Sequence, residues 1–236
     1  RIAGHVPGDE WADDERRSSI GHLSQRPDLA ALAVVFSFGA LLNAFAMTRP
    51  VYAAEQWMAQ AIGTTREATV LAILFAGALV VLPVVLLGGA GAITRATLGA
   101  RGPVLPIVVR FACVLVPLGA GVWAAHYAFH FLTAVGTVVP VVQAAIVDAT
   151  GQALAGEPDW RWLGLRPGTV APLQIGFVVL GAFGSLLLTY GVSDRAYPER
   201  AWRASVAWMA LVVVLTLAAL WILSQPMEMR GTALAG

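Results

Sequence analysis

Long runs without charged side chains separate the charged residues of this chain, and this spacing constrains the fold more than any other feature. Nineteen uncharged residues run from Leu29 to Met47, and further apolar runs cover about 68–93, 170–192 and 204–223. A helix needs about 20 apolar residues to cross the ~30 Å hydrocarbon core of a bilayer. Each of these runs therefore predicts one membrane-spanning helix.

The composition agrees with a chain that lies mostly in lipid. Of its 236 residues, 58% are hydrophobic and 12% are charged, and the mean hydropathy is +0.74. Soluble domains carry about 25% charged residues, which cover their surface. The expected partners are therefore membrane lipids, and the net charge of +1 gives no indication of a nucleic-acid partner.

The middle of the chain is harder to divide. No fixed charge lies between Arg110 and Asp148, a gap of 37 residues, which corresponds to about 55 Å of helix. We expect one span at about 104–132, kinked at Pro117. A shorter helix or re-entrant segment would follow, broken at Pro140 and ending near Val147. Six spans would need a tight turn near His126, and the lack of turn residues there favours five.

A sixth helical segment is expected at the membrane surface, between Thr48 and Gly63. Pro50 suits its first turn, and apolar residues recur at helical spacing opposite Arg49 and two glutamines. This pattern is typical of an amphipathic helix that lies in the interface. The segment 64–67 (Thr, Thr, Arg, Glu) has the pattern of a capping box at the start of the next span.

The predicted fold class is an all-α integral membrane protein, a bundle of about five transmembrane helices with an interfacial amphipathic helix. Residues 1–28 would form a polar arm and residues 29–236 the transmembrane domain. Residue 1 is Arg and the arm has no apolar signal core, so we expect the chain to begin partway into a longer product.

Charge also predicts orientation. Nine arginines fall on the side of the N-terminus and five on the other, in both the five-span and the six-span arrangement, so the positive-inside rule makes the N-terminus cytoplasmic. All 15 basic residues are arginine, which with the Ala, Gly and Val richness indicates a high-GC bacterium. The expected location is the bacterial cytoplasmic (inner) membrane.

His126 and His130 are the residues most indicative of function. A spacing of four places both imidazoles on one helix face, and histidine inside a span is costly unless it is paired or bound. One histidine could be an axial haem ligand, both could bind one metal ion, or both could line a pocket for a quinone or a proton path. Hydrogen bonding to neighbouring helices is the fourth interpretation. The aromatic neighbours Tyr127, Phe129 and Phe131 would form the wall of such a pocket.

Other residues are weaker candidates. Arg110 would reach the membrane interface or contact an anionic lipid or a quinone head group. Met227 and Met229 follow the last span on the side of His130, and thioether and imidazole ligands together suit copper(I). The lone Cys113 cannot hold a cluster, a structural zinc or an internal disulfide. Tryptophans near helix ends fit the aromatic belt of the membrane: Trp57, Trp123, Trp160, Trp162, Trp202, Trp208 and Trp221.

Three segments resemble a bacterial family: Pro7–Glu10, His126–Phe131 and Gln225–Thr232. They are similar to the membrane domain of FesM-type 4Fe-4S membrane proteins, in which cysteine-rich ferredoxin motifs precede such helices. The resemblance implies a non-catalytic or electron-transfer subunit of a redox complex. Because the cluster cysteines are missing, it implies 4Fe-4S clusters upstream of residue 1 or in partner subunits.

The first functional expectation is therefore a membrane subunit that anchors soluble redox partners and exchanges electrons with the quinone pool. Two alternatives stay open: a permease subunit driven by a separate chain, or an assembly factor that handles metal through the His and Met residues. The chain has no Walker A sequence to power transport itself.

Overall fold

The computed structural model describes residues 26–161 and 164–227. Within these ranges the protein is a bundle of helices with five segments long and apolar enough to cross a membrane. The predicted fold class is therefore confirmed, and α8 (Val116–Ala134) runs through His126 without the turn that the six-span alternative needs. Residues 1–25 of the expected arm, Trp162 and Met229 lie outside the described residues.

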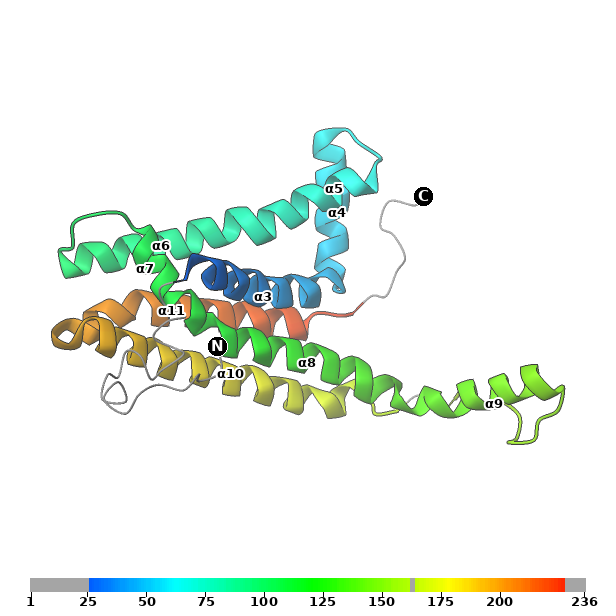
Figure 1. The fold of residues 1–236 in the computed structure, drawn as a ribbon. Coiled ribbons are helices and arrows are strands. Elements are labelled where there is room, and N and C mark those ends of the chain that lie inside the picture. Colours follow the sequence, from blue (N-terminus) through cyan, green and yellow to red (C-terminus); the bar gives the residue numbers. More distant parts are fainter. Residues whose placement is uncertain (1–25, 162–163, 228–236) are drawn as a thin grey trace, which may run out of the picture.

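The five spans run back and forth through the bundle (Figure 1). In chain order they are α3 (Pro27–Ala46), α5 with η2 and α6 (Glu67–Ala76, Gly77–Val81, Leu82–Leu98), α7 with η3 and α8 (Leu105–Phe111, Ala112–Leu115, Val116–Ala134), α10 (Pro167–Ala196) and α11 (Ala201–Ser224). Most predicted bounds agree to within a few residues. Two run further: the second span continues to Leu98 and the fourth to Ala196.

Arginines gather at one end of the bundle, which we call the arginine-rich end. The described ones are Arg26, Arg95, Arg101, Arg195, Arg200 and Arg203. Arg200 Nη1 donates to the carbonyl of Leu98 at 2.8 Å, so it satisfies a terminal carbonyl of α6. The start of α3 and the turn between α10 and α11 thus lie at the same end, while the charge run Asp9–Arg17 that we expect on this side lies outside the described residues.

The helix α4 (Arg49–Ile62) lies at the opposite end and runs across the direction of the spans (Figure 1). It is the interfacial helix that the sequence predicts. The face of α4 that turns towards the protein is not purely apolar, because it carries Glu55 together with Val51 and Ala59. Trp57 stays 69% exposed, as suits a side chain facing lipid head groups.

The expected capping box before the second span is wrong. The helix α5 begins at Glu67 with Arg66 as its N-cap, and no side chain caps it. Thr64 Oγ1 instead accepts a hydrogen bond from the backbone N–H of Arg66 at 3.2 Å. The hydroxyl therefore closes a local turn ahead of the helix, which is a common competitor of capping for Ser and Thr.

Three prolines explain where the long helices depart from α geometry. A proline lacks a backbone N–H and clashes with the carbonyl four residues earlier. Pro83 follows the π-helix η2, Pro117 follows the 3-10 turn η3, and Pro140 follows the 3-10 turn η4 (Val135–Thr137). In each case the residue four positions before the proline lies in the irregular turn.

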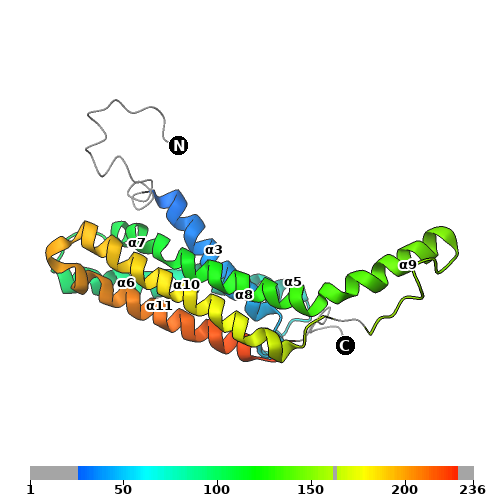
Figure 2. The same cartoon turned by 90° about the horizontal axis from the view of Figure 1, so that it is seen from below.

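The helix α9 (Val138–Thr150) follows η4 and does not re-enter the bundle. It continues α8 past the ends of α10 and α11 (Figures 1 and 2). The expected break at Pro140 is wrong, because Pro140 is the third residue of α9. A backbone N–H in the first turn has no acceptor within the helix, so its absence from proline costs nothing there. The interruption lies upstream, at η4, and the helix ends at Thr150 rather than near Val147.

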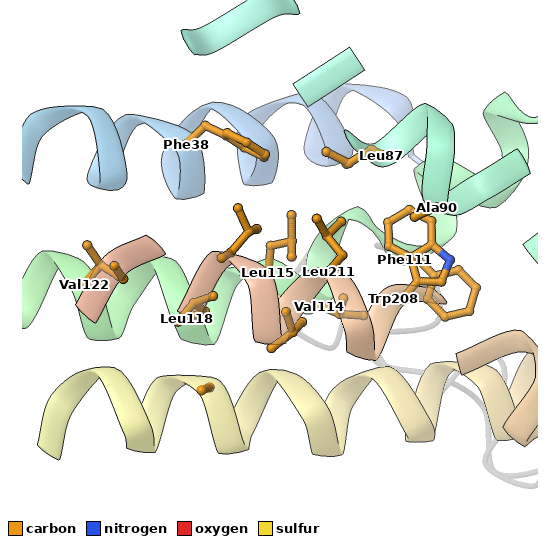
Figure 3. Close-up of a cluster of buried hydrophobic side chains, with 14 of the residues drawn as sticks. Phe38, Leu87, Ala90, Phe111, Val114, Leu115, Leu118, Val122, Trp208 and Leu211 are labelled. Atoms are coloured by element: carbon orange, nitrogen blue, oxygen red, sulfur yellow. The ribbon is translucent and has the colours of Figure 1, made fainter. Parts of the chain in front are cut away.

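The core is built around α8, which packs lengthwise on α10 and α3. Glycines bring α8 and α10 together, since a Cβ at Gly121 would lie 2.5 Å from the carbonyl oxygen of Phe177. Figure 3 shows the apolar cluster at the arginine-rich half, where Trp208 stacks on Phe111 with ring centroids 4.9 Å apart. Trp208 is fully buried, so its expected place in the aromatic belt is wrong.

Candidate functional site

The two histidines of α8 form the candidate site. His126 is 1% exposed and His130 is half-buried. Their ring centroids are 4.6 Å apart and the ring planes meet at 75°. The helix geometry produces this contact, because residues four apart lie above one another on the same face. The His126 ring lies inside the protein, as the cost of exposing an imidazole to hydrocarbon requires.

Two ring nitrogens of this pair are buried without a partner. Nδ1 of His126 and Nε2 of His130 make no hydrogen bond to any described residue. A neutral imidazole has one N–H donor and one acceptor nitrogen, and a buried group without its partner costs about 1–3 kcal/mol. The interpretation that both rings only bond to neighbouring helices leaves these two atoms unexplained.

The structure also shows a polar residue near the site that the sequence analysis missed. Gln174 of α10 is 4% exposed, and its Nε2 donates to the carbonyl of Ala125 at 3.2 Å. The bond fixes α8 against α10 directly beside His126. A glutamine within an apolar span was the signal, since such amides commonly bond across helices.

The histidines face the α3 side of α8. Gly119, two turns earlier on the same face, approaches α3 so closely that an added Cβ would lie 2.9 Å from Cα of Ser37. The helix period of 3.6 residues places His126 on this face. The pair therefore lies on the protein-facing side of α8.

The aromatic neighbours do not enclose the pair as expected. Tyr127 is 45% exposed and Phe131 is 66% exposed, because each is turned by about 100° from the preceding histidine. Tyr127 packs on Trp123, with ring centroids 4.6 Å apart. Phe129 meets His130 edge to face at 5.6 Å and is the aromatic residue in contact with the second ring.

Arg110 does not belong to this site. It lies 16 residues before His126, about 24 Å along the helix axis. Its Nη1 bonds to the hydroxyl of Tyr197 at 3.2 Å, and its guanidinium lies 5.6 Å from the centre of that ring. Arg110 therefore holds the third span against the α10–α11 turn at the arginine-rich end.

The metal interpretation has little support among the described residues. They contain no group of three or more His, Cys, Asp or Glu side chains that could hold an ion. Met227 pairs through its backbone with Thr48 at the junction of α3 and α4, and the neighbouring Arg49 N–H donates to the carbonyl of Pro226 at 3.0 Å. The structure thus fixes the backbone of Met227 at the end of the bundle near α4.

Two of the protein's cavities lie away from the histidines. A cavity of about 310 Å³ lies at the polar corner between α4 and α5, around Gln56, Gln60 and Thr64. A cavity of about 150 Å³ lies between α3, α6 and α11, around Phe38, Phe45 and Ile222.

Comparisons of this chain with protein-family models, curated proteins and solved structures give no match. The function is therefore argued from the side chains themselves.

Proposed function

We propose that this chain is the membrane subunit of a bacterial redox complex, and that His126 and His130 bind the head group of a quinone. It would anchor soluble electron-transfer subunits that carry the 4Fe-4S clusters, as the FesM-type resemblance of the sequence implies. The chain would sit in the cytoplasmic membrane with its arginine-rich end inside, because that end carries most of the positive charge.

The single observation that supports this function is the pair of buried nitrogens without partners, Nδ1 of His126 and Nε2 of His130. An imidazole N–H donates to a quinone carbonyl oxygen, and an unprotonated nitrogen accepts from a quinol hydroxyl. The two rings, 4.6 Å apart, offer both functions at one place in an apolar span. A quinone bound there would supply the two-electron chemistry that the chain's own side chains lack.

The alternatives fit less well. A haem held by two axial histidines needs one ligand on each face of its iron. Two histidines on one helix cannot ligate opposite faces of one iron, so a second helix would have to provide the other ligand. A metal ion needs at least three or four protein ligands in a closed site, and the described side chains bring only these two imidazoles together.

Photolabelling with an azidoquinone tests the proposal. The purified chain in lipid nanodiscs should carry the label on the α8 peptide around residues 123–131, and excess menaquinone should compete it away. His126→Leu and His130→Leu keep side-chain bulk but remove the nitrogens. Each should reduce labelling by about tenfold, which corresponds to about 1.4 kcal/mol of binding energy.

The matched control is Cys113→Ala, which changes the turn η3 of the same span, outside the histidine pair, and should label like the native chain. Circular dichroism and gel filtration should show that all variants keep their fold. Unchanged labelling in both leucine variants would show that the histidines are structural. Haem absorption in the spectrum of the purified protein would show that the ligand is a porphyrin and not a quinone.

A further inference from the structure

The helix α9 extends beyond the thickness of a membrane. The continuous helical segment Leu105–Thr150 has 46 residues, or about 69 Å at 1.5 Å per residue. A bilayer with its head groups measures about 40–45 Å. To fit inside, the segment would have to tilt by about 50°, beyond the 0–40° range of membrane helices. α8 instead packs along α10, so the excess length emerges at the end near α4.

Figures 1 and 2 show where this excess length goes. The interfacial helix α4 runs across the spans and marks the level of the membrane surface at its end of the bundle. α9 begins at about that level and points away from the bundle. Among the described elements it has its main contacts with the turn η4 that precedes it.

The outward face of α9 is apolar. Val138, Val141 and Val142 are 59%, 52% and 50% exposed, and they share one face with the exposed Ala145. Spacings of three and four residues form a continuous stripe along the helix. Such a stripe outside the hydrocarbon core is the feature that proteins present to a groove on another protein.

The opposite face of α9 is already covered by its own chain. Gln143 bonds to the return segment at two points, donating to the carbonyl of Ala155 at 2.9 Å and accepting from the N–H of Asp159 at 3.4 Å. The chain then rejoins α8, where the N–H of Leu165 donates to the carbonyl of Leu132 at 2.9 Å. Residues 135–161 thus form a built projection, which we call the α9 arm.

The arm carries negative charge near its tip. Asp148, Glu157 and Asp159 are exposed, and the charge that opposes them is Arg161, whose Nε lies 3.1 Å from Oδ1 of Asp159. Two carboxylates, Asp148 and Glu157, have no ion pair with the described residues. Asp148 lies three residues after Ala145 on α9, so a partner that covers the stripe would meet a carboxylate at its end, whereas Glu157 belongs to the return segment on the other side of the helix.

We propose that the α9 arm is the docking surface for a second protein, in the compartment opposite the arginine-rich end, which presents an apolar groove with a basic rim. The arm would bind this partner whether or not the chain handles quinone. Charge complementarity across the rim would set the orientation, and the valine stripe would provide the buried area.

A second copy of the chain fits this surface poorly. Two copies in one membrane share the same orientation, so their arms would meet in parallel around an axis normal to the membrane. Each acidic tip would then face its counterpart at the same height. Like charges facing each other oppose association, which favours a different, basic partner.

Site-directed spin labelling tests the proposal with the full chain. Cys113 is the single native cysteine, so Cys113→Ala gives the background for Val142→Cys on the arm. Val84→Cys on α6, 68% exposed to lipid, and Gln152→Cys at the exposed tip are the controls. Oxygen reports contact of the spin label with lipid, and a nickel chelate reports its contact with water. Both are applied to proteoliposomes of the purified chain and to membranes of the source organism.

The expected result has two parts. In proteoliposomes the label at residue 142 should meet the nickel chelate, like residue 152 and unlike residue 84. In native membranes it should be protected from both reagents, by at least about fivefold relative to proteoliposomes. Asp148→Lys should abolish most of this protection, whereas Asp194→Lys at the arginine-rich end should leave it unchanged.

Each other outcome overturns the proposal. Contact of residue 142 with oxygen in proteoliposomes would place α9 in the bilayer. Full access to the nickel chelate in native membranes would show that nothing covers the arm. Protection in proteoliposomes, or a disulfide between two Val142→Cys copies, would show self-association instead.

Discussion

Polar side chains inside the spans divide into two groups at the residue scale. Most bond to a carbonyl within reach, as Ser37 Oγ does to Ala33 at 2.8 Å and Thr189 Oγ1 does to Ser185 at 2.7 Å. Three buried nitrogens have no partner among the described residues, and they belong to His126, His130 and Trp208. Trp208 stacks on Phe111 in the apolar cluster, whereas the two histidines contact each other edge to face.

The burial of Trp208 gives a direct prediction. Its ring is fully buried and stacks on Phe111 with an interplanar angle of 7°. Trp208→Ala should lower the free energy of unfolding by about 3–5 kcal/mol, the usual cost of deleting a buried aromatic side chain. Trp202→Ala, at a position that is 65% exposed, should change it by less than about 1 kcal/mol. Thermal or denaturant unfolding in detergent compares the two, and equal losses would contradict the placement of Trp208.

Glu55 gives a prediction about pH. It lies outside the membrane-spanning segments and is 6% exposed on the inner face of α4. Burial raises the pKa of its carboxyl above the ordinary value, and the nearby Glu67 carboxylate raises it further. The folded protein thus binds a proton that the unfolded chain releases at lower pH. Stability should fall as pH rises from the ordinary glutamate pKa through the raised one.

Glu55→Gln removes this titration and should flatten the decline. The melting temperature of the variant should exceed that of the native chain above the raised pKa, and the two should converge at low pH. If the melting temperatures of both proteins changed with pH in parallel, ionisation of Glu55 would not destabilise the folded protein. Gln56→Glu, at an exposed neighbouring position, serves as a control for adding a carboxyl to the same helix.

At the element scale, close approach between α8 and α10 holds the centre of the bundle. A Cβ at Gly181 would lie 2.6 Å from the carbonyl oxygen of Pro117. A Cβ at Gly121 would lie 2.5 Å from the carbonyl oxygen of Phe177. Small residues allow such contact between membrane helices, where apolar burial alone gives no preference for protein over lipid. Ser185 completes the contact, because its Oγ accepts from the N–H of Leu118 at 3.0 Å. Leu118 lies in the first turn of α8, where backbone N–H groups have no acceptor within the helix.

Alanine substitutions test this contact. Gly181→Ala should destabilise the protein by about 1–3 kcal/mol, since the clash is with backbone atoms that cannot rotate away. Gly176→Ala, on the same helix with no atom near the added Cβ, should be neutral or stabilise by up to about 1 kcal/mol. Unfolding in one detergent measures both, and a stable Gly181→Ala would mean that the helices are further apart.

At the scale of the whole molecule, orientation follows from charge. Apart from Arg110 within the third span, the described arginines number six at the arginine-rich end and four at the other, the latter being Arg49, Arg66, Arg161 and Arg166. Residues near span ends decide orientation during insertion. We therefore expect the arginine-rich end in the cytoplasm.

Cysteine labelling checks this orientation in the Cys113→Ala background. Glu199→Cys, in the exposed turn between α10 and α11, should react with a membrane-impermeant maleimide in inverted vesicles but not in intact cells. Gln152→Cys, at the other end, should show the reverse. Reaction of both positions from one side would contradict the five-span arrangement.

The sequence predicted the number of spans but only part of the candidate site. Charge-free length is a one-dimensional property, and it locates the spans because lipid tolerates few charges. His126 and His130 were found because imidazoles inside an apolar run are rare. The sequence analysis missed Gln174 and predicted Arg110 as a contact of a quinone head group. Contacts between helices cannot be read from the spacing of residues along one helix.

The chain's own sequence therefore predicted five helices long and apolar enough to cross a membrane, the helix between Thr48 and Gly63, and a shared helix face for the two histidines. Only the tertiary structure decided that Trp208 is central, that Glu55 is buried, and that α9 leaves the bundle. The physical reason is that spans are apolar on all sides. Lipid-facing and protein-facing residues then look alike in sequence, and only the packing of neighbouring helices distinguishes them.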